Sequence, residues 1–493
     1  MRGVVKDRNI ALATLVAALG YFVDIFDLLL FALVRRNSLS ELLRPKIEAA
    51  QQVVAERLTT ADGPTMQREF ARVEDTILRD AGLMLDNILQ MTGLVLGGIL
   101  WGVLADRYGR LQMLFGSILV YSAANILNAF VQDIPPESAL GWMHAVGLGS
   151  AYHQYAVLRF VAGVGLAGEL GAGITLVSEL VSKEKRGFAT TIVATVGILG
   201  AVCAYFVTRV VDWRNAFLIG GMLGLALLFL RVGVVESGMF DRVKTADGVG
   251  RGAFWMLVWP RERAMRYLAV IVCALPIWYC VGVLVKFCDA IGGSLGLGID
   301  AKPDPGLAIM WCYVGLALGD LASGLLSQLL RSRKRALLAF HALTAVAVGC
   351  YFLSARGGLT MFYAAIAFVG FACGYWAVFV TTAAEQFGTN LRATAATTAP
   401  NFVRWSAALS GLLWGGFEVL LGGSRVPGAG DPSASWRAAA LVGAILLPAA
   451  MYAAATMRET FGSSLDWIEE PDGGRREGSG SAGAGAQDAP AAP

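Results

Sequence analysis

The stretch Gly102-Val-Leu-Ala-Asp106-Arg107-Tyr-Gly109-Arg110-Leu-Gln-Met-Leu114 lies between two long apolar runs and carries three charged side chains within five residues. Glycines at 102 and 109 allow close helix approach and a tight turn. We therefore expect two membrane-spanning helices here, joined by a short charged loop in water.

The composition indicates that most of the chain lies in lipid. Of 493 residues, 56% are hydrophobic and 16% are charged, whereas soluble domains are about one quarter charged. A spanning helix needs about 20 mostly apolar residues. Twelve such runs occur, at 10–34, 87–104, 113–131, 155–176, 188–208, 216–235, 267–290, 306–330, 336–353, 359–384, 397–421 and 437–456. The expected fold class is an all-α membrane protein with twelve transmembrane helices.

Basic residues in the short loops predict the orientation. They occur between helices 2 and 3, 4 and 5, and 8 and 9, whereas 132–149 has neither Lys nor Arg. We expect a multi-pass protein of the plasma (inner) membrane with both termini cytoplasmic. The formal net charge of +3 gives no support for nucleic-acid binding.

Two segments depart from the apolar pattern. Residues 37–83 are rich in Ala and charge, with apolar residues at helical spacing, and predict an extracytoplasmic helical hairpin. It serves either as a solvated cap or as a lid or docking site. Residues 459–493 predict a cytoplasmic tail that is mostly disordered, because 473–493 is almost entirely Gly, Ala, Ser, Pro and polar residues.

The chain also repeats itself. Glu179 precedes Arg186 by seven residues, Glu385 precedes Arg392 by seven, and each pair follows an apolar run. The spacing predicts two pseudo-symmetric six-helix bundles, with the substrate site between them. Their expected bounds are 1–236 and 267–458, joined by a cytoplasmic connector at 237–266.

These motifs resemble the major facilitator superfamily. The opening stretch matches its cytoplasmic signature, and Arg159-Phe-Val-Ala-Gly163-Val-Gly165-Leu-Ala-Gly168-Glu169, Glu179 to Arg186-Gly187, Arg231 to Glu236-Ser237 and Glu385 to Arg392 resemble its metabolite:proton symporter branch. The resemblance spans both halves but omits residues 37–83. It implies that the signature cluster is a cytoplasmic gate that stabilises the outward-facing state. The expected gate residues are Gly102, Asp106, Arg107, Gly109, Arg110, Glu179, Arg186 and Glu236.

Physical chemistry supports this role. Asp106 can face the positive end of a neighbouring helix, and Arg107 and Arg110 can pair with Glu179 or Glu236. The alternative is that these basic residues only set the topology. In the second half Gln328 occupies the position of the acid, which predicts a weaker second latch.

Ionisable residues inside the spans are candidate sites, because a charge in lipid must be paired or face a water-filled cavity. Asp24 and Asp27 lie three residues apart on one face of helix 1, where neighbouring acids are suited to hold a proton. With Glu169 they are the proton-coupling candidates; the alternative is structural pairing with a buried cation.

Candidate substrate ligands are the cations and aromatic residues able to reach a central cavity. Arg404 and Lys286 suit an anionic substrate. The alternatives are that Lys286 pairs with Asp289 and Arg404 with an acid of helix 1, and that the aromatic residues serve packing. The full set is Arg404, Lys286, Asn401, Arg159, Tyr279 and Trp376.

Other chemistries lack support in the sequence. The fingerprint Gly163-Val-Gly165-Leu-Ala-Gly168 lies in an apolar helix with no preceding strand, and the seven cysteines form no CxxC pair. We expect no enzyme, cofactor or metal. We expect a monomeric secondary active transporter that moves a small metabolite, an organic acid or other carboxylate, by proton symport with alternating access. The alternatives are a proton-independent exchanger or exporter, and a transporter-derived receptor that acts through 37–83.

Overall fold

The structure, a computed structural model, describes residues 2–57, 62–181, 186–231, 252–297, 303–423 and 431–477. The helices of the first half are α1 (Arg2–Leu42), α2 (Arg44–Arg57), α3 (Gly63–Gly82), the π-helix η1 (Leu83–Gln90), α4 (Met91–Tyr108), α5 (Arg110–Asn128), the 3-10 helix η2 (Gly141–His144), α6 (Ala151–Leu166), α7 (Glu169–Leu180), α8 (Arg186–Val210) and α9 (Trp213–Arg231).

The second half begins with the short helix α11. Its elements are α11 (Trp255–Val258), α12 (Arg261–Tyr279), the π-helix η3 (Cys280–Val285), α13 (Cys288–Ser294), α14 (Pro305–Leu329), α15 (Arg333–Ser354), the 3-10 helix η5 (Ala355–Gly357), α16 (Gly358–Ala372), α17 (Trp376–Glu385), α18 (Arg392–Leu420), α19 (Ala434–Thr456) and an antiparallel hairpin of β1 (Trp467–Glu469) and β2 (Arg475–Glu477).

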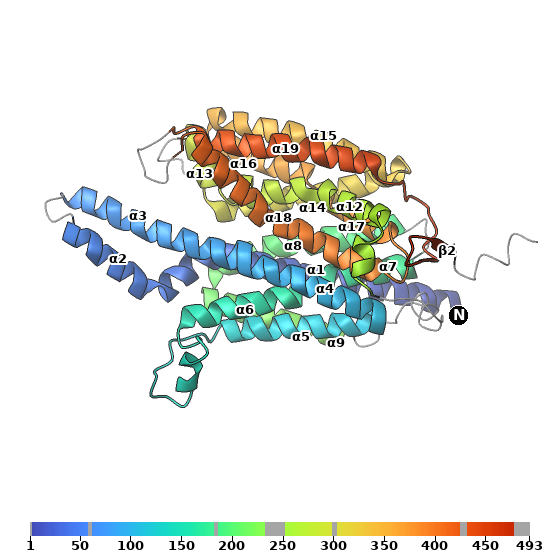
Figure 1. The fold of residues 1–493 in the computed structure, drawn as a ribbon, viewed down its shortest axis with the longest axis horizontal. Coiled ribbons are helices and arrows are strands. Elements are labelled where there is room, and N and C mark those ends of the chain that lie inside the picture. The colour runs from blue at the N-terminus through green and yellow to red at the C-terminus, as the bar shows by residue number, and fades with distance from the viewer. Residues whose placement is uncertain are drawn as a thin grey trace, which may run out of the picture.

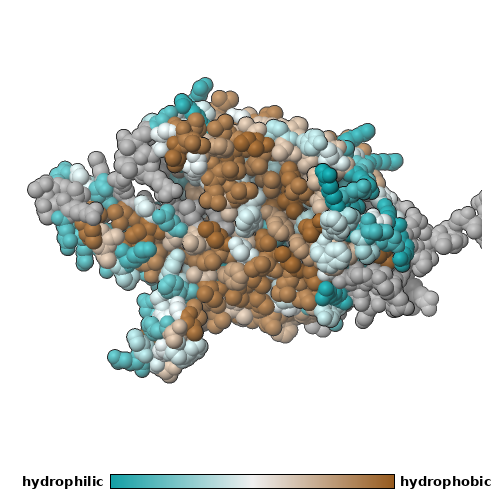
Figure 2. Space-filling model, in the orientation of Figure 1, coloured by the Kyte–Doolittle hydropathy of each residue, from teal (hydrophilic) through white to brown (hydrophobic). Residues whose placement is uncertain are grey.

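The helices confirm the all-α membrane fold with two bundles. Within the described residues, eight stretches are long and apolar enough to cross a membrane. One of these, 333–385, holds both α15 and the pair α16–α17, and the other expected spans are present as α5, α6–α7 and α18. Figure 2 shows the apolar band on the middle of the molecule and hydrophilic side chains at its ends.

The two bundles meet along α4 with α18 and along α8 with α14. Glycine permits the first contact: a Cβ built on Gly102 would lie 2.9 Å from the Cα atom of Thr394 on α18. Gly109 separates α4 from α5 with a φ of 116°, a conformation that residues with a side chain rarely adopt. The signature stretch is therefore a tight turn beside the interface between the halves.

The N-terminus and the β-hairpin lie at the same end of the bundle, which we call the terminal end (Figure 1). At the opposite, distal end, α2 and α3 project beyond the other helices. α3 continues through η1 into α4, because the residues at both junctions keep helical backbone angles. The segment expected to form a helical hairpin, 37–83, thus holds the end of α1 together with α2, α3 and the start of η1.

The C-terminal tail, expected to be mostly disordered over residues 459–493, is ordered in its first part. Residues 459–477 fold against the terminal end, where Leu465 and Trp467 are buried. The Thr389 backbone N–H donates to the Trp467 carbonyl at 2.9 Å. We call residues 459–477 the C-terminal strap; residues 478–493 lie outside the described chain.

Candidate functional site

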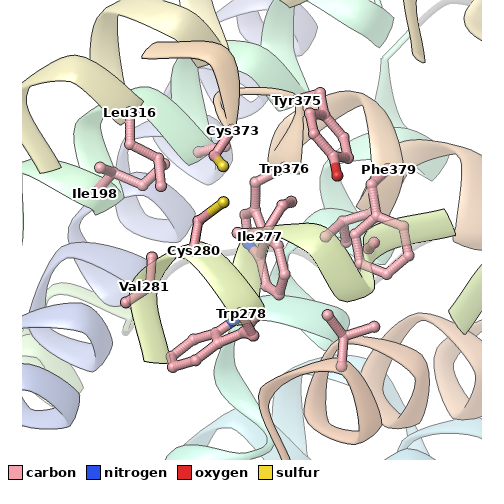
Figure 3. Packing of buried hydrophobic residues seen from close by; sticks show 14 of the residues in the cluster. Ile198, Ile277, Trp278, Cys280, Val281, Leu316, Cys373, Tyr375, Trp376 and Phe379 are labelled. Atoms are coloured by element: carbon pink, nitrogen blue, oxygen red, sulfur yellow. The ribbon is translucent and has the colours of Figure 1, made fainter. Parts of the chain in front are cut away.

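A small cavity lies between the two halves. Its walls come from α1, α8, α12, η3, α14, α17 and α18, and its lining residues are Tyr21, Ile25, Ile198, Ile277, Trp278, Val281, Tyr313, Leu316, Trp376 and Arg404. Figure 3 shows Trp278, Trp376, Ile198 and Leu316 packed in one cluster with side chains from both halves. The cavity measures about 20 Å³, which is room for about one water molecule. The site is therefore closed around no more than a water-sized space.

Arg404 is the one cation on the wall of this cavity among the described residues. Its Nη2 lies 3.3 Å from Asp24 Oδ2 on α1, and its Nη1 donates to Asn401 Oδ1 at 3.2 Å. Its guanidinium carbon also lies 5.7 Å from the centre of the Trp376 ring. Both charged side chains are buried. Arg404 thus joins an acid from one half to an aromatic face from the other.

This ion pair leaves bonding capacity unused. Arg404 Nε and Asp24 Oδ1 are buried without a hydrogen-bond partner among the described residues. Asn401 crosses the interface as well, since its Nδ2 donates to the Ala167 carbonyl at 3.1 Å. That carbonyl is free to accept because the helix breaks between α6 and α7.

Asp27 lies in a second polar cluster, inside the first half. It is fully buried, neither of its oxygens has a hydrogen-bond partner among the described residues, and the charge of Arg159 acts on it. Arg159 donates to Asn125 at 2.5 Å and lies 4.6 Å from the centre of the Phe217 ring. A carboxylate in a membrane-spanning helix that lacks such bonds is costly to keep charged.

The remaining predicted site residues divide between the cavity and the packing around it. Glu169 begins α7, is buried, and its charge acts on Asp24. Tyr279 donates to the Ala439 carbonyl at 2.7 Å, within the second half. Lys286 is buried where η3 ends, away from the lining of the cavity. Neither Tyr279, Lys286 nor Arg159 therefore lines the central cavity, in contrast to the expectation.

Asp106 is near the end of α4, and its carboxylate contacts the start of α18 in the other half. Its carboxylate accepts hydrogen bonds from the backbone N–H of Ala393 at 3.2 Å, from that of Thr394 at 2.8 Å, and from the Thr394 hydroxyl at 2.7 Å. The N-terminus of a helix carries a partial positive charge, so a carboxylate there is stabilised. Asp106 thus ties the two halves together at the terminal end.

A buried ion pair lies beside this contact. Glu179 Oε1, at the end of α7, accepts from Arg392 Nη1 at 3.0 Å, and Arg392 Nη2 donates to the Leu465 carbonyl of the C-terminal strap at 2.6 Å. Arg107, expected to pair with Glu179, has an exposed side chain. Arg110 and Arg186 begin α5 and α8, and Glu236 lies outside the described residues.

The sequence reasoning missed Arg392 as a partner for Glu179. The sequence pattern offered Arg107 and Arg110 as partners for an acid such as Glu179, whereas the observed pair joins the acid of the first repeat to the arginine of the second. Within the second half, Glu385 bonds Arg333 at 3.3 Å and the Thr460 hydroxyl at 2.8 Å. The repeat itself was the available signal, because related positions in two halves meet at their common interface.

In the second half, Gln328 occupies the position that corresponds to Asp106. Gln328 is near the end of α14, and its side chain packs against the start of α8. A Cβ built on Gly187 would fall 1.6 Å from Gln328 Nε2. That nitrogen is buried without a hydrogen-bond partner among the described residues. An amide carries no charge to offset the partial positive charge of the helix start.

The distal end is held across the halves by an exposed ion pair. Arg209 Nη2 on α8 lies 2.6 Å from Asp304 Oδ2 at the start of α14, and both side chains are about half exposed. Exposed pairs of this kind contribute about 0–1 kcal/mol. Asp106 and Glu179 thus join the halves by buried contacts at the terminal end, whereas this pair at the distal end is exposed.

Comparison with known proteins places this geometry in a family. The model of the Major Facilitator Superfamily matches residues 87–411. NiaP of Bacillus subtilis, provisionally assigned to niacin/nicotinamide transport, is 27% identical over 329 residues, covering 65% of this chain and 75% of NiaP. The 3-(3-hydroxy-phenyl)propionate transporter of Escherichia coli is 26% identical over 337 residues, covering 67% and 76%. The structure of the proton:xylose symporter XylE with 6-bromo-6-deoxy-D-glucose matches with a TM-score of 0.66 at 16% identity, over 93% of this chain and 98% of XylE.

Proposed function

Because this chain belongs to the major facilitator superfamily and is a transporter rather than an enzyme, we propose that it takes up a small carboxylic acid together with protons by alternating access. Two relatives support this substrate class. One is assigned to niacin and nicotinamide and the other transports 3-(3-hydroxy-phenyl)propionate. Niacin and the propionate each carry a carboxylate and an aromatic ring.

The observation that carries the proposal is the 3.3 Å pair of Arg404 and Asp24 on the cavity wall. Arg404 offers two-pronged binding to a carboxylate, and Trp376 beside it offers a face for a ring. Asp24 occupies part of this guanidinium in the closed state. Protonation of Asp24 removes the competing charge, so that a substrate carboxylate can take its place. One proton bound at Asp24 thus allows one substrate carboxylate to bind at Arg404.

Asp27 and Glu169 are the further places where a coupling proton can reside. Both are buried in the first half, and the charges of Asp24 and Glu169 act on each other, whereas Arg159 acts on Asp27. Like charges held close together in lipid do not all stay ionised. A proton bound at Asp24 can therefore be shared with, or passed to, a neighbouring acid.

The exposed contact at the distal end and the buried contacts at the terminal end support an order in which the two ends open. The exposed Arg209–Asp304 pair opens first, which admits substrate from the distal side while Asp106 and Glu179 keep the terminal end shut. Substrate and proton binding then favours release of the terminal contacts. We place the terminal end in the cytoplasm, since the loops there are rich in Arg and Lys.

The test is uptake of labelled niacin into proteoliposomes under an inward proton gradient, with nicotinamide as the neutral analogue. We expect wild type to accumulate niacin. Asp24→Asn should still exchange niacin across the membrane but should lose accumulation against a gradient. Arg404→Gln should lose both activities, and Arg404→Lys should regain part of the exchange, because a lysine keeps the charge without the two-pronged geometry.

Four outcomes would contradict parts of the proposal. Gradient-driven accumulation by Asp24→Asn, with its loss in Asp27→Asn, would move coupling to Asp27. Equal transport with and without the gradient in wild type would favour the proton-independent exchanger or exporter. Transport of nicotinamide in preference to niacin would refute the carboxylate substrate. Ligand binding without flux would favour a receptor.

A further inference from the structure

A large cavity opens at the terminal end, outside the transport path. It measures about 510 Å³ and lies between the first turns of α12 and the last turns of α19. Pro260, which precedes α12, and Gly473, which belongs to the C-terminal strap, also line it. Both helices are candidate membrane spans, Arg261–Val285 and Ala434–Thr456. The cavity therefore lies where the bundle leaves the apolar layer.

One side of this cavity is basic. Arg263, Arg266 and Arg458 line it. Arg263 and Arg266 share a single carboxylate, Glu469, at 3.0 and 2.6 Å. Arg458 is exposed and makes no ion pair with any residue that the structure describes. Counting Glu469 and the exposed Glu262 against the three arginines leaves one net positive charge facing the cavity.

The other side is apolar and faces the lipid. Met265 and Leu268 on α12 are 55% and 48% exposed, and Tyr452 on α19 is 74% exposed. Val272 continues this surface one turn deeper, and Ala449 leaves space beside it. Tyrosine is enriched where the acyl region of a bilayer meets its headgroups. The apolar wall thus begins at headgroup level and continues into the bilayer.

We propose that this cavity binds an anionic phospholipid. Its phosphate would lie at Arg458 and Arg266, and its acyl chains along Leu268, Val272 and Tyr452. Arginine forms two-pronged hydrogen bonds to phosphate oxygens, and basic pockets between membrane helices take anionic headgroups on the cytoplasmic side. A soluble anion would use the arginines alone and leave the apolar wall uncovered, so the combined surface favours a lipid.

The site is separate from the central cavity. None of its lining residues belongs to the central cavity or touches Asp24, Asp27 or Arg404. It is next to the C-terminal strap, because Arg263 also donates to the Glu470 carbonyl. The bound lipid would therefore cover the outer face of the segment that holds the terminal end together.

The experiment is native mass spectrometry of the purified full chain with added dioleoyl-phosphatidylglycerol or dioleoyl-phosphatidylcholine. We expect wild type to retain phosphatidylglycerol in preference to phosphatidylcholine. Arg458→Gln should weaken retention of phosphatidylglycerol about fivefold, since one basic side chain near anionic lipid contributes about 1 kcal/mol. Ala449→Trp, which fills the cavity from the exposed side, should remove the bound population altogether.

A matched control is Arg356→Gln, which removes the charge of an exposed arginine in η5, at the far end of α15. It should bind phosphatidylglycerol like wild type. Equal retention of both lipids by wild type, or wild-type retention by Arg458→Gln and Ala449→Trp, would overturn the proposal. So would binding of inorganic phosphate that responds to Arg458→Gln but not to Ala449→Trp, because that pattern indicates a free-anion site. Circular dichroism would verify that each variant is folded.

Discussion

Replacing Asp106 with asparagine tests how the terminal end is kept closed. The carboxylate accepts three hydrogen bonds from the start of α18, at 3.2, 2.8 and 2.7 Å. Asparagine has one oxygen, so it can keep at most two of these bonds, and its amide group then faces donors. It also loses the negative charge at the helix N-terminus. The closed state is weakened without any change in side-chain volume.

The magnitude follows from these losses. A hydrogen bond to a charged group contributes about 1.5–3 kcal/mol, and a charge at a helix end contributes about 0.3–2 kcal/mol in a partly buried setting. Together we expect about 2–5 kcal/mol against the closed state. Since each 1.4 kcal/mol is tenfold, the open population should rise about 30- to 4000-fold.

The assay is alkylation of a cysteine placed at the interface. Thr397 on α18 is buried against α7, where a Cβ built on Gly171 would lie 2.4 Å from the Thr397 Cα atom. In a chain without the native cysteines, Thr397→Cys should react with a water-soluble maleimide only when the terminal end opens. Asp106→Asn should raise the reaction rate in proportion to the open population.

The matched control is Asp320→Asn. Asp320 is also a buried carboxylate at a helix N-terminus, since it accepts from the Ala377 N–H of α17 at 3.0 Å, but both residues belong to the second half. Its loss should leave the alkylation rate unchanged. Unchanged labelling in Asp106→Asn, or an equal rise in both variants, would refute the reasoning that Asp106 holds the halves together.

Three further predictions concern the terminal end. Gln328→Asp should strengthen the second latch by placing a charge at the start of α8 beside Gly187; Thr397→Cys labelling and transport rate should both fall, and faster transport would contradict this. Glu469→Gln should lower the free energy of unfolding by about 3 kcal/mol, and with it the melting temperature, because it leaves buried Arg263 without its carboxylate. An unchanged melting temperature would show that the C-terminal strap adds no stability. Burial raises the pKa of Glu459, but hydrogen bonds from the Ser332 hydroxyl and backbone N–H groups outweigh it and hold the pKa below its ordinary value of 4.5. This stabilisation is present above pH 4.5 and is lost as the pH falls through the lowered pKa, so melting of Glu459→Gln should depend less on pH between 7 and 3 than that of wild type.

The spans and their pairing into halves could be predicted from the sequence. A spanning helix depends on an apolar run that is contiguous in the chain, and its backbone bonds are local. The short turn at Gly109 and the helical content of 37–83 follow from equally local features. The acids at 24 and 27 were found for the same reason, because a charge within an apolar run is visible without knowing its neighbours.

Only the tertiary structure decided which of these charges meet. Arg404 and Asp24 are 380 residues apart, and Glu179 and Arg392 are 213 apart. Helical periodicity shows which residues share a face, but the direction of that face depends on how each helix packs against distant ones. This is why Tyr279 lies against α19 rather than in the cavity. The C-terminal strap was missed for a related reason: it is ordered by contacts with residues distant in the chain, such as Thr389 and Arg392.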